Sequence, residues 1–317
     1  MNPSAASRAT SPPDIGHDGC VNAVMHVAPM HSSRQDTVGA AVSVRGLRVP
    51  PVFVRADVPL AGGSTPWLPL AVPLAMKAHA TLELAGAVDR LALANTAAAQ
   101  ALLQSWFADW QCVDVRAEFV VDDPTMGSGV GAFFSGGLDS LHTVITRSDE
   151  ITHLIFVHGF DIDVRDDVRA RRVADVIRRA AAFLDKPVIE VATNLRRLSD
   201  QAMVWDREFH GAAMAMVAQS LATELHRVVI PGTWPAGKSP VWGSHPDLDR
   251  LWSSGAVAIS HDAGHHTRVA KLRDLADHPE LLENLRVCWR NSGDDLNCGR
   301  CEKCVRTKLA LIAAAIP

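Results

Sequence analysis

The sequence predicts an α/β protein with a parallel sheet, and three observations support this fold class. From residue 127 onward, short apolar runs alternate with segments of helical periodicity. One of these runs, Val130 to Phe134, is apolar or Gly throughout, as expected for a strand buried on both faces. About half of the chain is apolar (48%), which suffices for a large core and argues against extensive disorder.

The overall composition limits the classes of function. At 317 residues the chain has the length of one large domain or two modest ones. Its formal net charge of −4 argues against sequence-independent binding of nucleic acid, which requires an excess of Lys and Arg. No apolar run reaches the roughly 18–20 residues of a membrane-spanning helix, and the N-terminus lacks the pattern of a secretory signal. We therefore expect a cytoplasmic protein that contacts neither nucleic acid nor membrane.

The first 126 residues divide into two regions. Residues 1–40 are rich in Ser, Pro, Ala and Gly without periodicity, and they predict a mobile tail. Residues 41–126 predict a small N-terminal α/β subdomain, with strands at 42–44, 52–54, 81–84 and 113–119 and a helix at 88–108. This subdomain contains no catalytic constellation. We expect it to cover the active site, recognise a substrate or form a homodimer, and its residues do not favour one of these roles.

The remaining region, residues 127–317, contains repeated βα units. We expect strands at 130–134, 153–157, 187–191 and 228–230, and helices from about 139, over 164–184 and over 208–225. Such units form a parallel sheet through right-handed crossovers. Ligands of these sheets bind at the carboxyl ends of the strands.

A glycine-rich turn follows the first of these strands and has the chemistry of a phosphate site. Gly136 and Gly137 permit a tight turn whose N–H groups can converge on an anion, and the next helix begins there. Ser135 and Ser140 offer hydroxyl groups to phosphate oxygens. Asp139 would repel a bare phosphate, so its presence indicates a bound Mg²⁺. The turn lacks the Gly-Lys-Ser/Thr ending of a Walker A loop.

The segment Ser135-Gly136-Gly137-Leu138-Asp139-Ser140 resembles the signature of the PP-loop ATP pyrophosphatases, the adenine nucleotide alpha hydrolase-like group. The resemblance implies a Rossmann-like parallel sheet of the PP-loop/HUP type that binds ATP and Mg²⁺. Enzymes of this family cleave ATP between the α and β phosphates, adenylate a carboxylate or carbonyl oxygen and release pyrophosphate. Residues 135–140 are then expected to bind the pyrophosphate, and Asp139 to hold Mg²⁺.

Four of the six cysteines crowd into residues 288–304. Cys288, Cys298, Cys301 and Cys304 are spaced C-x9-C-x2-C-x2-C, and four thiolates can enclose Zn²⁺ in a tetrahedron with bonds of about 2.3 Å. Similar spacing occurs in iron–sulfur proteins, in which the chemistry would differ entirely. Because no ionisable base stands out inside this segment, we favour a closed structural zinc site.

The cysteine cluster also resembles the C-terminal zinc site of the 7-cyano-7-deazaguanine synthase family. These PP-loop enzymes convert a carboxylate to an amide and then to a nitrile, using ammonia and ATP. The resemblance rests on Val287-Cys288-Trp289 and on the run from Cys298 to Cys304. Residues 1–130 have no counterpart in that family, and residues 232–266 differ from it. We therefore carry over the fold, ATP and zinc, but not the deazaguanine substrate.

Further polar residues follow the predicted strands. Lys238, in the loop after the fourth strand, is expected to neutralise charge on the leaving pyrophosphate, although an ordinary surface lysine is the simpler interpretation. Asp161 and Asp163 could reach a ribose or a metal, but Asp163 suits a helix N-cap equally well. Asp139, Ser140 and Lys238 are the expected catalytic residues.

Two other groups of residues carry weaker signals. Asn194, together with Arg196 and Arg197, could bind an anionic substrate, and an exposed arginine pair is the simpler interpretation. His265 and His266 show no regular ligand spacing with the nearby His261, so we expect no metal role for them.

Three functions are consistent with these residues. The favoured one is an ATP-dependent, amidotransferase-like ligase that adenylates a small-molecule carboxylate or carbonyl and installs nitrogen from an ammonia donor, giving an amide or nitrile. The second is an ATP-dependent sulfur-transfer enzyme of the same family. The third is a non-catalytic nucleotide-sensing module.

Overall fold

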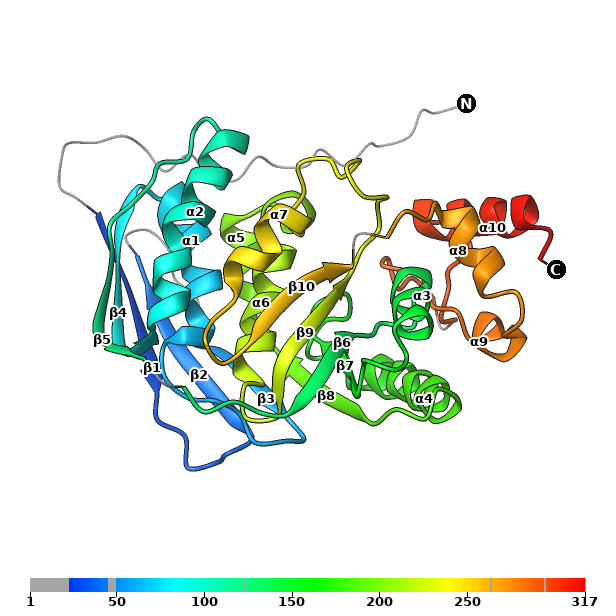
Figure 1. Cartoon of the computed structure of the whole chain (residues 1–317), viewed down its shortest axis with the longest axis horizontal. Coiled ribbons are helices and arrows are strands. Elements are labelled where there is room, and N and C mark those ends of the chain that lie inside the picture. Colours follow the sequence, from blue (N-terminus) through cyan, green and yellow to red (C-terminus); the bar gives the residue numbers. More distant parts are fainter. Residues whose placement is uncertain (1–22, 45–49, 123, 263, 294, 317) are drawn as a thin grey trace.

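The structure, a computed structural model, describes residues 23–44, 50–122, 124–262, 264–293 and 295–316. Its centre is a ten-stranded sheet with the strand order β10-β9-β6-β7-β8-β3-β2-β1-β4-β5 (Figure 1). The strands are β1 (Ala23–Met30), β2 (Thr37–Ser43), β3 (Val52–Ala56), β4 (Ala80–Asp89), β5 (Val115–Val121), β6 (Gly129–Phe133), β7 (His153–His158), β8 (Val188–Thr193), β9 (Leu225–Pro231) and β10 (Ala258–Asp262).

Ten α-helices accompany the sheet in the described part of the chain. They are α1 (Leu68–Lys77), α2 (Arg90–Trp106), α3 (Leu138–Thr146), α4 (Asp167–Phe183), α5 (Arg196–Ala202), α6 (His210–Ser220), α7 (Pro246–Asp249), α8 (Arg268–Asp274), α9 (Pro279–Glu283) and α10 (Glu302–Ala314). Short 3-10 turns lie at Thr65–Trp67 and Arg250–Trp252, and a π turn at Trp205–Phe209 precedes α6. None of these helices combines the length and the apolar character needed to cross a bilayer.

The C-terminal half of the sheet is parallel, as predicted. Strands β6 to β10 pair only in parallel with one another, and their order is β8-β7-β6-β9-β10. Side chains alternate between two cores along β6. Ala132 packs with α3 and α4, while Phe133 packs with α6. Helices therefore cover both faces of this half, which explains the continuous apolar run in the sequence.

The N-terminal half of the sheet is covered on one face only. In β1, Met25 and Val27 are buried among residues of α1, whereas His26 and Ala28 are exposed. Figure 1 shows α1 and α2 on the same side of strands β1, β2 and β4. This arrangement produces an alternating pattern of buried and exposed residues in the strands.

Two of the expectations for the N-terminal region need correction. Residues 23–40, expected within the mobile tail, form β1 and most of β2, and residues 1–22 lie outside the described part. In β1 the buried Met25 and Val27 alternate with Ala, His and Pro. Because these residues are not typical of strands, the sequence pattern did not indicate a strand here. The region 41–126 also shares one continuous sheet with the C-terminal region, because β3 pairs antiparallel with β8.

The joint between β3 and β8 is reinforced by a side chain. Asn194, directly after β8, accepts a hydrogen bond at Oδ1 from the Phe53 N–H (2.9 Å) and donates from Nδ2 to the Pro51 carbonyl (2.9 Å). The Thr193 hydroxyl donates to the Phe53 carbonyl (2.6 Å). The buried amide of Asn194 is thus occupied with β3, and the interpretation of this residue as an anion ligand is wrong.

We predict that Asn194→Ala lowers the free energy of unfolding by about 1–3 kcal/mol, because it leaves a strand N–H and a carbonyl without partners. Urea denaturation followed by circular dichroism measures the effect. Gln201→Ala, which removes an exposed contact within α5, is the matched control and is expected to stay within about 0.5 kcal/mol of the parent. Equal stability of the two variants would contradict this role of Asn194.

Candidate functional site

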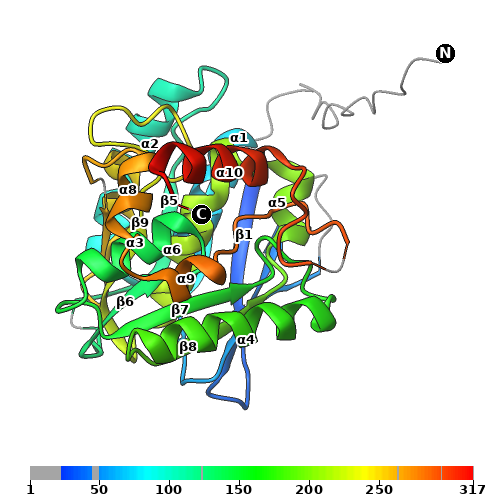
Figure 2. The ribbon, with the colours of Figure 1, turned by 90° about the vertical axis from the view of Figure 1, so that its right-hand side faces the viewer.

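The glycine-rich turn lies at the carboxyl end of β6, the strand at which the chain changes direction across the sheet. The chain proceeds from β6 to β7 and β8 on one side, and later returns to β9 and β10 on the other. Crossovers that leave in opposite directions open a crevice at this point, where ligands of such sheets bind. Figure 2 shows helices α3, α8, α9 and α10 grouped beside this part of the sheet.

The turn has the backbone conformation that its glycines suggested. Gly136 has φ +70°, a backbone conformation that residues with a Cβ rarely adopt. A Cβ at this position would also lie only 3.1 Å from Ile177 Cδ1, so both the backbone conformation and the packing favour glycine. Gly137 is the N-cap of α3 and, being glycine, supplies no side-chain cap to the first-turn N–H groups. Ser135 is exposed, while Leu138 is buried in the core behind the turn. The result is a helix N-terminus suited to an anion.

The two hydroxyls of the turn differ in their surroundings. The buried Ser140 Oγ donates to the Gly137 carbonyl at 2.9 Å, which closes the first turn of α3. Ser135 has an exposed side chain and remains open to an incoming ligand. In this conformation Ser140 stabilises the turn, and its role as a phosphate ligand stays a prediction.

Asp139 is held by a cation that the sequence analysis missed. The buried Lys271, in α8, places Nζ 2.7 Å from Asp139 Oδ1 and 2.5 Å from the Gly232 carbonyl. Thr233 Oγ1 donates to Asp139 Oδ2 (3.2 Å), and Arg268 Nη1 lies 4.0 Å from that oxygen. The turn, the end of β9 and α8 are therefore joined around one carboxylate. Because α8 is only seven residues long, no periodic pattern marked it in the sequence.

Lys238 occupies a different environment from Lys271. It is exposed in the loop after β9, and its side chain makes no hydrogen bond or ion pair in the part of the chain that the structure describes. Its proposed role on the pyrophosphate remains a prediction.

A second buried cation lies against the turn. The backbone N–H of Arg286 donates to the Gly136 carbonyl at 2.9 Å, and its guanidinium contacts Asn291 Oδ1 (3.1 Å) and lies 3.9 Å from Asp161. Burial lowers the pKa of Arg286, as it does that of Arg268. Three cations, at positions 268, 271 and 286, face two carboxylates, those of Asp139 and Asp161. The surroundings of the turn thus favour an anion.

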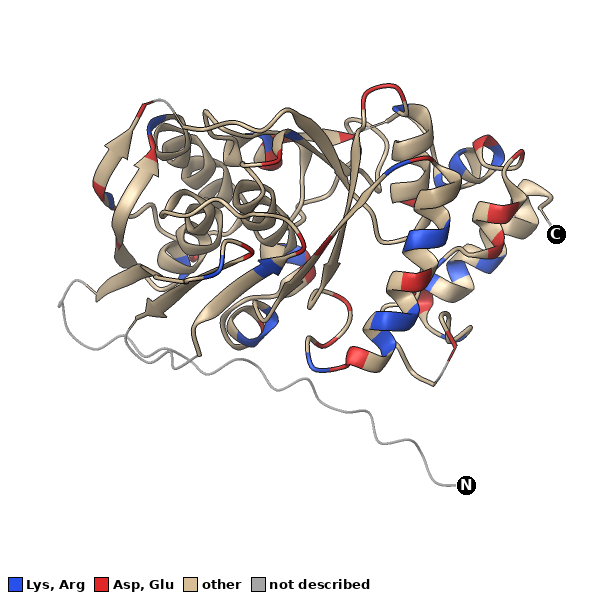
Figure 3. Ribbon diagram, turned by 90° about the horizontal axis from the view of Figure 1, so that it is seen from below, with Lys and Arg blue, Asp and Glu red and all other residues tan. Residues whose placement is uncertain are grey.

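Other predicted site residues are engaged locally. The Asp163 carboxylate accepts hydrogen bonds from the Arg165 guanidinium (2.6 Å) and from the Arg165 backbone N–H (2.9 Å), and these contacts lower the pKa of this carboxyl. Asp166, not Asp163, caps α4. Arg196 bonds Asp200 and stacks over Trp205, whereas Arg197 is exposed. Figure 3 shows positive and negative residues interspersed along the helices on the face it presents.

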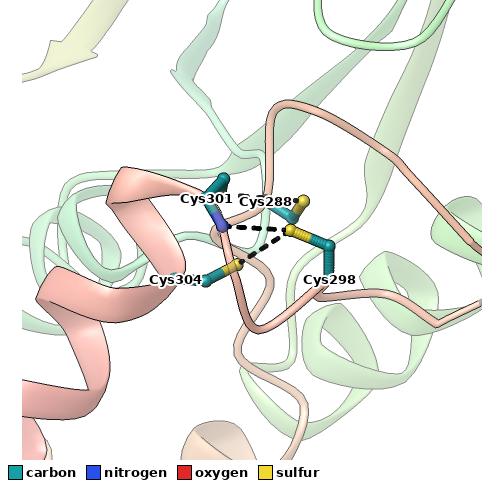
Figure 4. A group of neighbouring side chains, drawn as sticks. All are labelled: Cys288, Cys298, Cys301 and Cys304. Atoms are coloured by element: carbon teal, nitrogen blue, oxygen red, sulfur yellow. Dashed lines mark hydrogen bonds between the residues drawn. The ribbon is translucent and has the colours of Figure 1, made fainter. Parts of the chain in front are cut away.

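The four clustered cysteines converge as predicted (Figure 4). Their sulfur atoms all lie within 4.8 Å of one another, with 3.9 Å between Cys288 and Cys301 and 4.0 Å between Cys298 and Cys304. A tetrahedral site with bonds of about 2.3 Å has sulfur–sulfur edges of about 3.8 Å. A four-iron cluster places each thiolate on a separate iron and so needs wider spacing. The group could therefore hold a single metal ion such as zinc.

The backbone around the cysteines supports this geometry. Gly299 has φ +68°, which lets the chain reverse between Cys298 and Cys301. N–H groups of Arg300 and Cys301 lower the pKa of the Cys298 thiol to about 6, which favours the thiolate that binds metal. Asn297 Oδ1 accepts from the N–H of Cys288 (3.1 Å) and thereby fixes the entry to the cluster. A bound ion would hold these loops, which include the segment after Arg286, against the turn.

Comparison with known proteins adds no family to this description: no family model matches the chain, and a search of curated proteins finds no significant match.

We predict that Cys301→Ala weakens metal binding and lowers the thiolate-to-metal charge transfer, since it removes one of the four sulfur ligands and leaves three. Substitution with Co²⁺ checks this, because thiolate-to-cobalt charge transfer gives an intense near-ultraviolet band. Cys112→Ala removes an exposed cysteine outside the cluster and is the control. A brown spectrum with acid-labile sulfide after anaerobic purification would contradict a single-ion site.

Proposed function

We propose that this chain is an ATP-dependent ligase of the PP-loop pyrophosphatase type. It adenylates a small-molecule carboxylate, releases pyrophosphate and installs nitrogen to give an amide or a nitrile. The observation that carries the proposal is the Ser-Gly-Gly-Leu-Asp-Ser turn, which opens α3 at the crevice of the sheet beside the buried Lys271. We expect the reaction to run in the cytoplasm, with zinc at the cysteine cluster.

Different residues around the turn would have different roles in binding the triphosphate. The N–H groups at the start of α3 would bind the β and γ phosphates, whose charge the helix N-terminus favours. Lys271 and Arg268 lie beside Asp139 and would neutralise charge that develops on the leaving pyrophosphate. Asp139 is the carboxylate that would hold Mg²⁺, which supplies further neutralisation when it enters with ATP.

The bond changes of the proposed reaction are balanced without a redox partner. A carboxylate oxygen of the substrate attacks the α phosphorus, the bond between the α phosphorus and the bridging oxygen breaks, and pyrophosphate leaves with that electron pair. Ammonia then attacks the acyl carbon, AMP departs and a proton is lost, which leaves the amide. A second ATP would adenylate the amide oxygen, with release of pyrophosphate and of one N–H proton. Departure of AMP and of the remaining N–H proton would then give the nitrile.

The cysteine geometry favours nitrogen over sulfur as the nucleophile. A sulfur-transfer enzyme needs a thiol free to carry persulfide, or an iron–sulfur cluster. Here Cys288, Cys301 and Cys304 are buried, and all four sulfurs of the cluster face one another. The other cysteine in the described part of the chain, the exposed Cys112, follows α2 in the N-terminal region and not the glycine-rich turn. The low pKa and partial exposure of Cys298 are the features that keep sulfur transfer as the second candidate.

We predict that Asp139→Asn and Lys271→Met each lower kcat for pyrophosphate release by about 100- to 1,000-fold, the usual effect of losing one charged group at a reacting phosphate or oxyanion. The assay is ammonia-dependent release of AMP and pyrophosphate across a panel of carboxylates. Arg179→Gln removes an exposed cation of α4 and is the control. Lys238→Met tests the remaining predicted catalytic residue in the same assay.

Three outcomes separate the hypotheses. Full turnover in Asp139→Asn would overturn the assignment of the turn. ATP binding by calorimetry without pyrophosphate release for any acceptor would favour the nucleotide-sensing module. Release that depends on a sulfide or persulfide donor in place of ammonia would favour sulfur transfer.

A further inference from the structure

A second group of metal-ligating side chains lies where α3 packs against α8. His142 comes from α3, Asp274 is the last residue of α8, and His266 precedes the N-cap of the same helix. His142 Nε2 lies 3.0 Å from Asp274 Oδ2, and His266 Nδ1 lies 2.5 Å from that same oxygen. The three ligand atoms all lie within 4.8 Å of one another.

The packing of the two helices explains why these residues meet. On α3, His142 follows Asp139 by three positions, and on α8, Asp274 follows Lys271 by three positions. Residues three apart share one face of a helix. The helices consequently present two matched polar layers, Asp139 with Lys271 and then His142 with Asp274. Sequence spacing could not reveal the group, because 132 residues separate His142 from Asp274.

We propose that His142, His266 and Asp274 form a binding site for a divalent transition-metal ion such as zinc, separate from the cysteine cluster. Two imidazole nitrogens and one carboxylate oxygen are a donor set that suits Zn²⁺, Co²⁺ and Ni²⁺ and does not suit Mg²⁺ or Ca²⁺. Three protein ligands leave a fourth position for water.

The arrangement differs from an ordinary histidine–carboxylate pair in two respects. Both imidazoles direct a ring nitrogen at the same carboxylate oxygen, so three ligand atoms from three residues are already gathered in one group. The site is also buried on one side and accessible to solvent on the other. His142 is buried against α8, whereas His266 and Asp274 are exposed, so an ion can enter from solvent without unfolding a helix.

The position of the site gives it a mechanical consequence. An ion there would tie α8 to α3 one helical turn from the contact between Lys271 and Asp139. It would restrict the movement of Lys271 relative to the turn at Ser135–Ser140. An effect on nucleotide affinity rests on the proposed function, but the binding of the ion does not.

Zinc binding to the full-length protein tests the proposal, with Zn²⁺ alone as the probe. Chains already loaded at the cysteine cluster are dialysed against buffered zinc, and bound zinc is measured by elemental analysis. We expect the parent and His265→Ala to bind one ion more than His266→Ala and Asp274→Asn. His265 is the matched control, because it is the exposed neighbour of His266 and lies outside the group. We expect His266→Ala and Asp274→Asn to lower the zinc affinity of this site by more than about 100-fold. The loss of a direct ligand should exceed the roughly 10- to 100-fold loss that typically follows removal of an outer-shell partner.

Cobalt spectra distinguish the two sites. The second Co²⁺ equivalent should add weak visible bands without thiolate charge transfer, and Asp274→Asn should lose those bands while it keeps the cysteine signal. Identical zinc content in the parent, His265→Ala, His266→Ala and Asp274→Asn would overturn the proposal. So would a second ion that persists when both His266 and Asp274 are replaced. Neither result depends on ATP or on any substrate, so failure here is distinct from failure of the proposed ligase activity.

Discussion

The buried ammonium group of Lys271 joins three segments on which the site depends. It bonds Asp139 at the start of α3 and the Gly232 carbonyl at the end of β9, and it is itself carried by α8. A charged group taken out of water is stable only when paired and hydrogen-bonded. Removing one partner of such a pair typically costs about 3–5 kcal/mol, so α8 cannot move away without a substitute anion. An incoming triphosphate is a group of the right charge to be that substitute.

The continuous sheet determines how this site is supported. Strand β6 lies between β9 and β7, with both faces covered by helices, and so provides a rigid base for the turn. The antiparallel joint between β3 and β8 adds the N-terminal strands to the far edge of the same sheet. The N-terminal region is thus an extension of the scaffold, and the face that α1 leaves open is the same face of the sheet that α3 and α4 cover in the C-terminal half.

The features that could be predicted from the sequence are those encoded by neighbouring residues. The turn at Ser135–Ser140 and the four cysteines are each local, and the alternation of apolar runs with helical periodicity indicated the strands from β6 to β9. Helix α1 escaped notice because Pro69 and Pro73 interrupt its pattern, although the residues from 68 to 76 are buried.

The features that could not be predicted depend on contacts between distant residues. Lys271 lies 132 positions from Asp139, and nothing in the sequence distinguishes it from the exposed Lys238. Asn194 looked like a ligand because it follows a strand at the ligand-binding edge, and only the pairing of β3 with β8 showed that its amide is occupied. Polar residues at a strand end therefore need a known neighbour before a role can be assigned to them.

Arg286 and Cys288 are only two positions apart in the chain. This short segment joins the glycine-rich turn, where a nucleotide is proposed to bind, to the cysteine cluster, where a metal ion is proposed to bind. Arg286 holds Gly136 through its backbone, and the cysteine cluster begins two residues later. If a bound ion sets the position of this segment, the ion and the nucleotide share a coupling free energy, and that coupling acts equally in both directions. On the proposed function, a chain with bound nucleotide would retain its metal more tightly against a chelator, and a chain without metal would bind ATP more weakly by the same factor. Metal supply would in this way set the fraction of the protein that binds the proposed nucleotide.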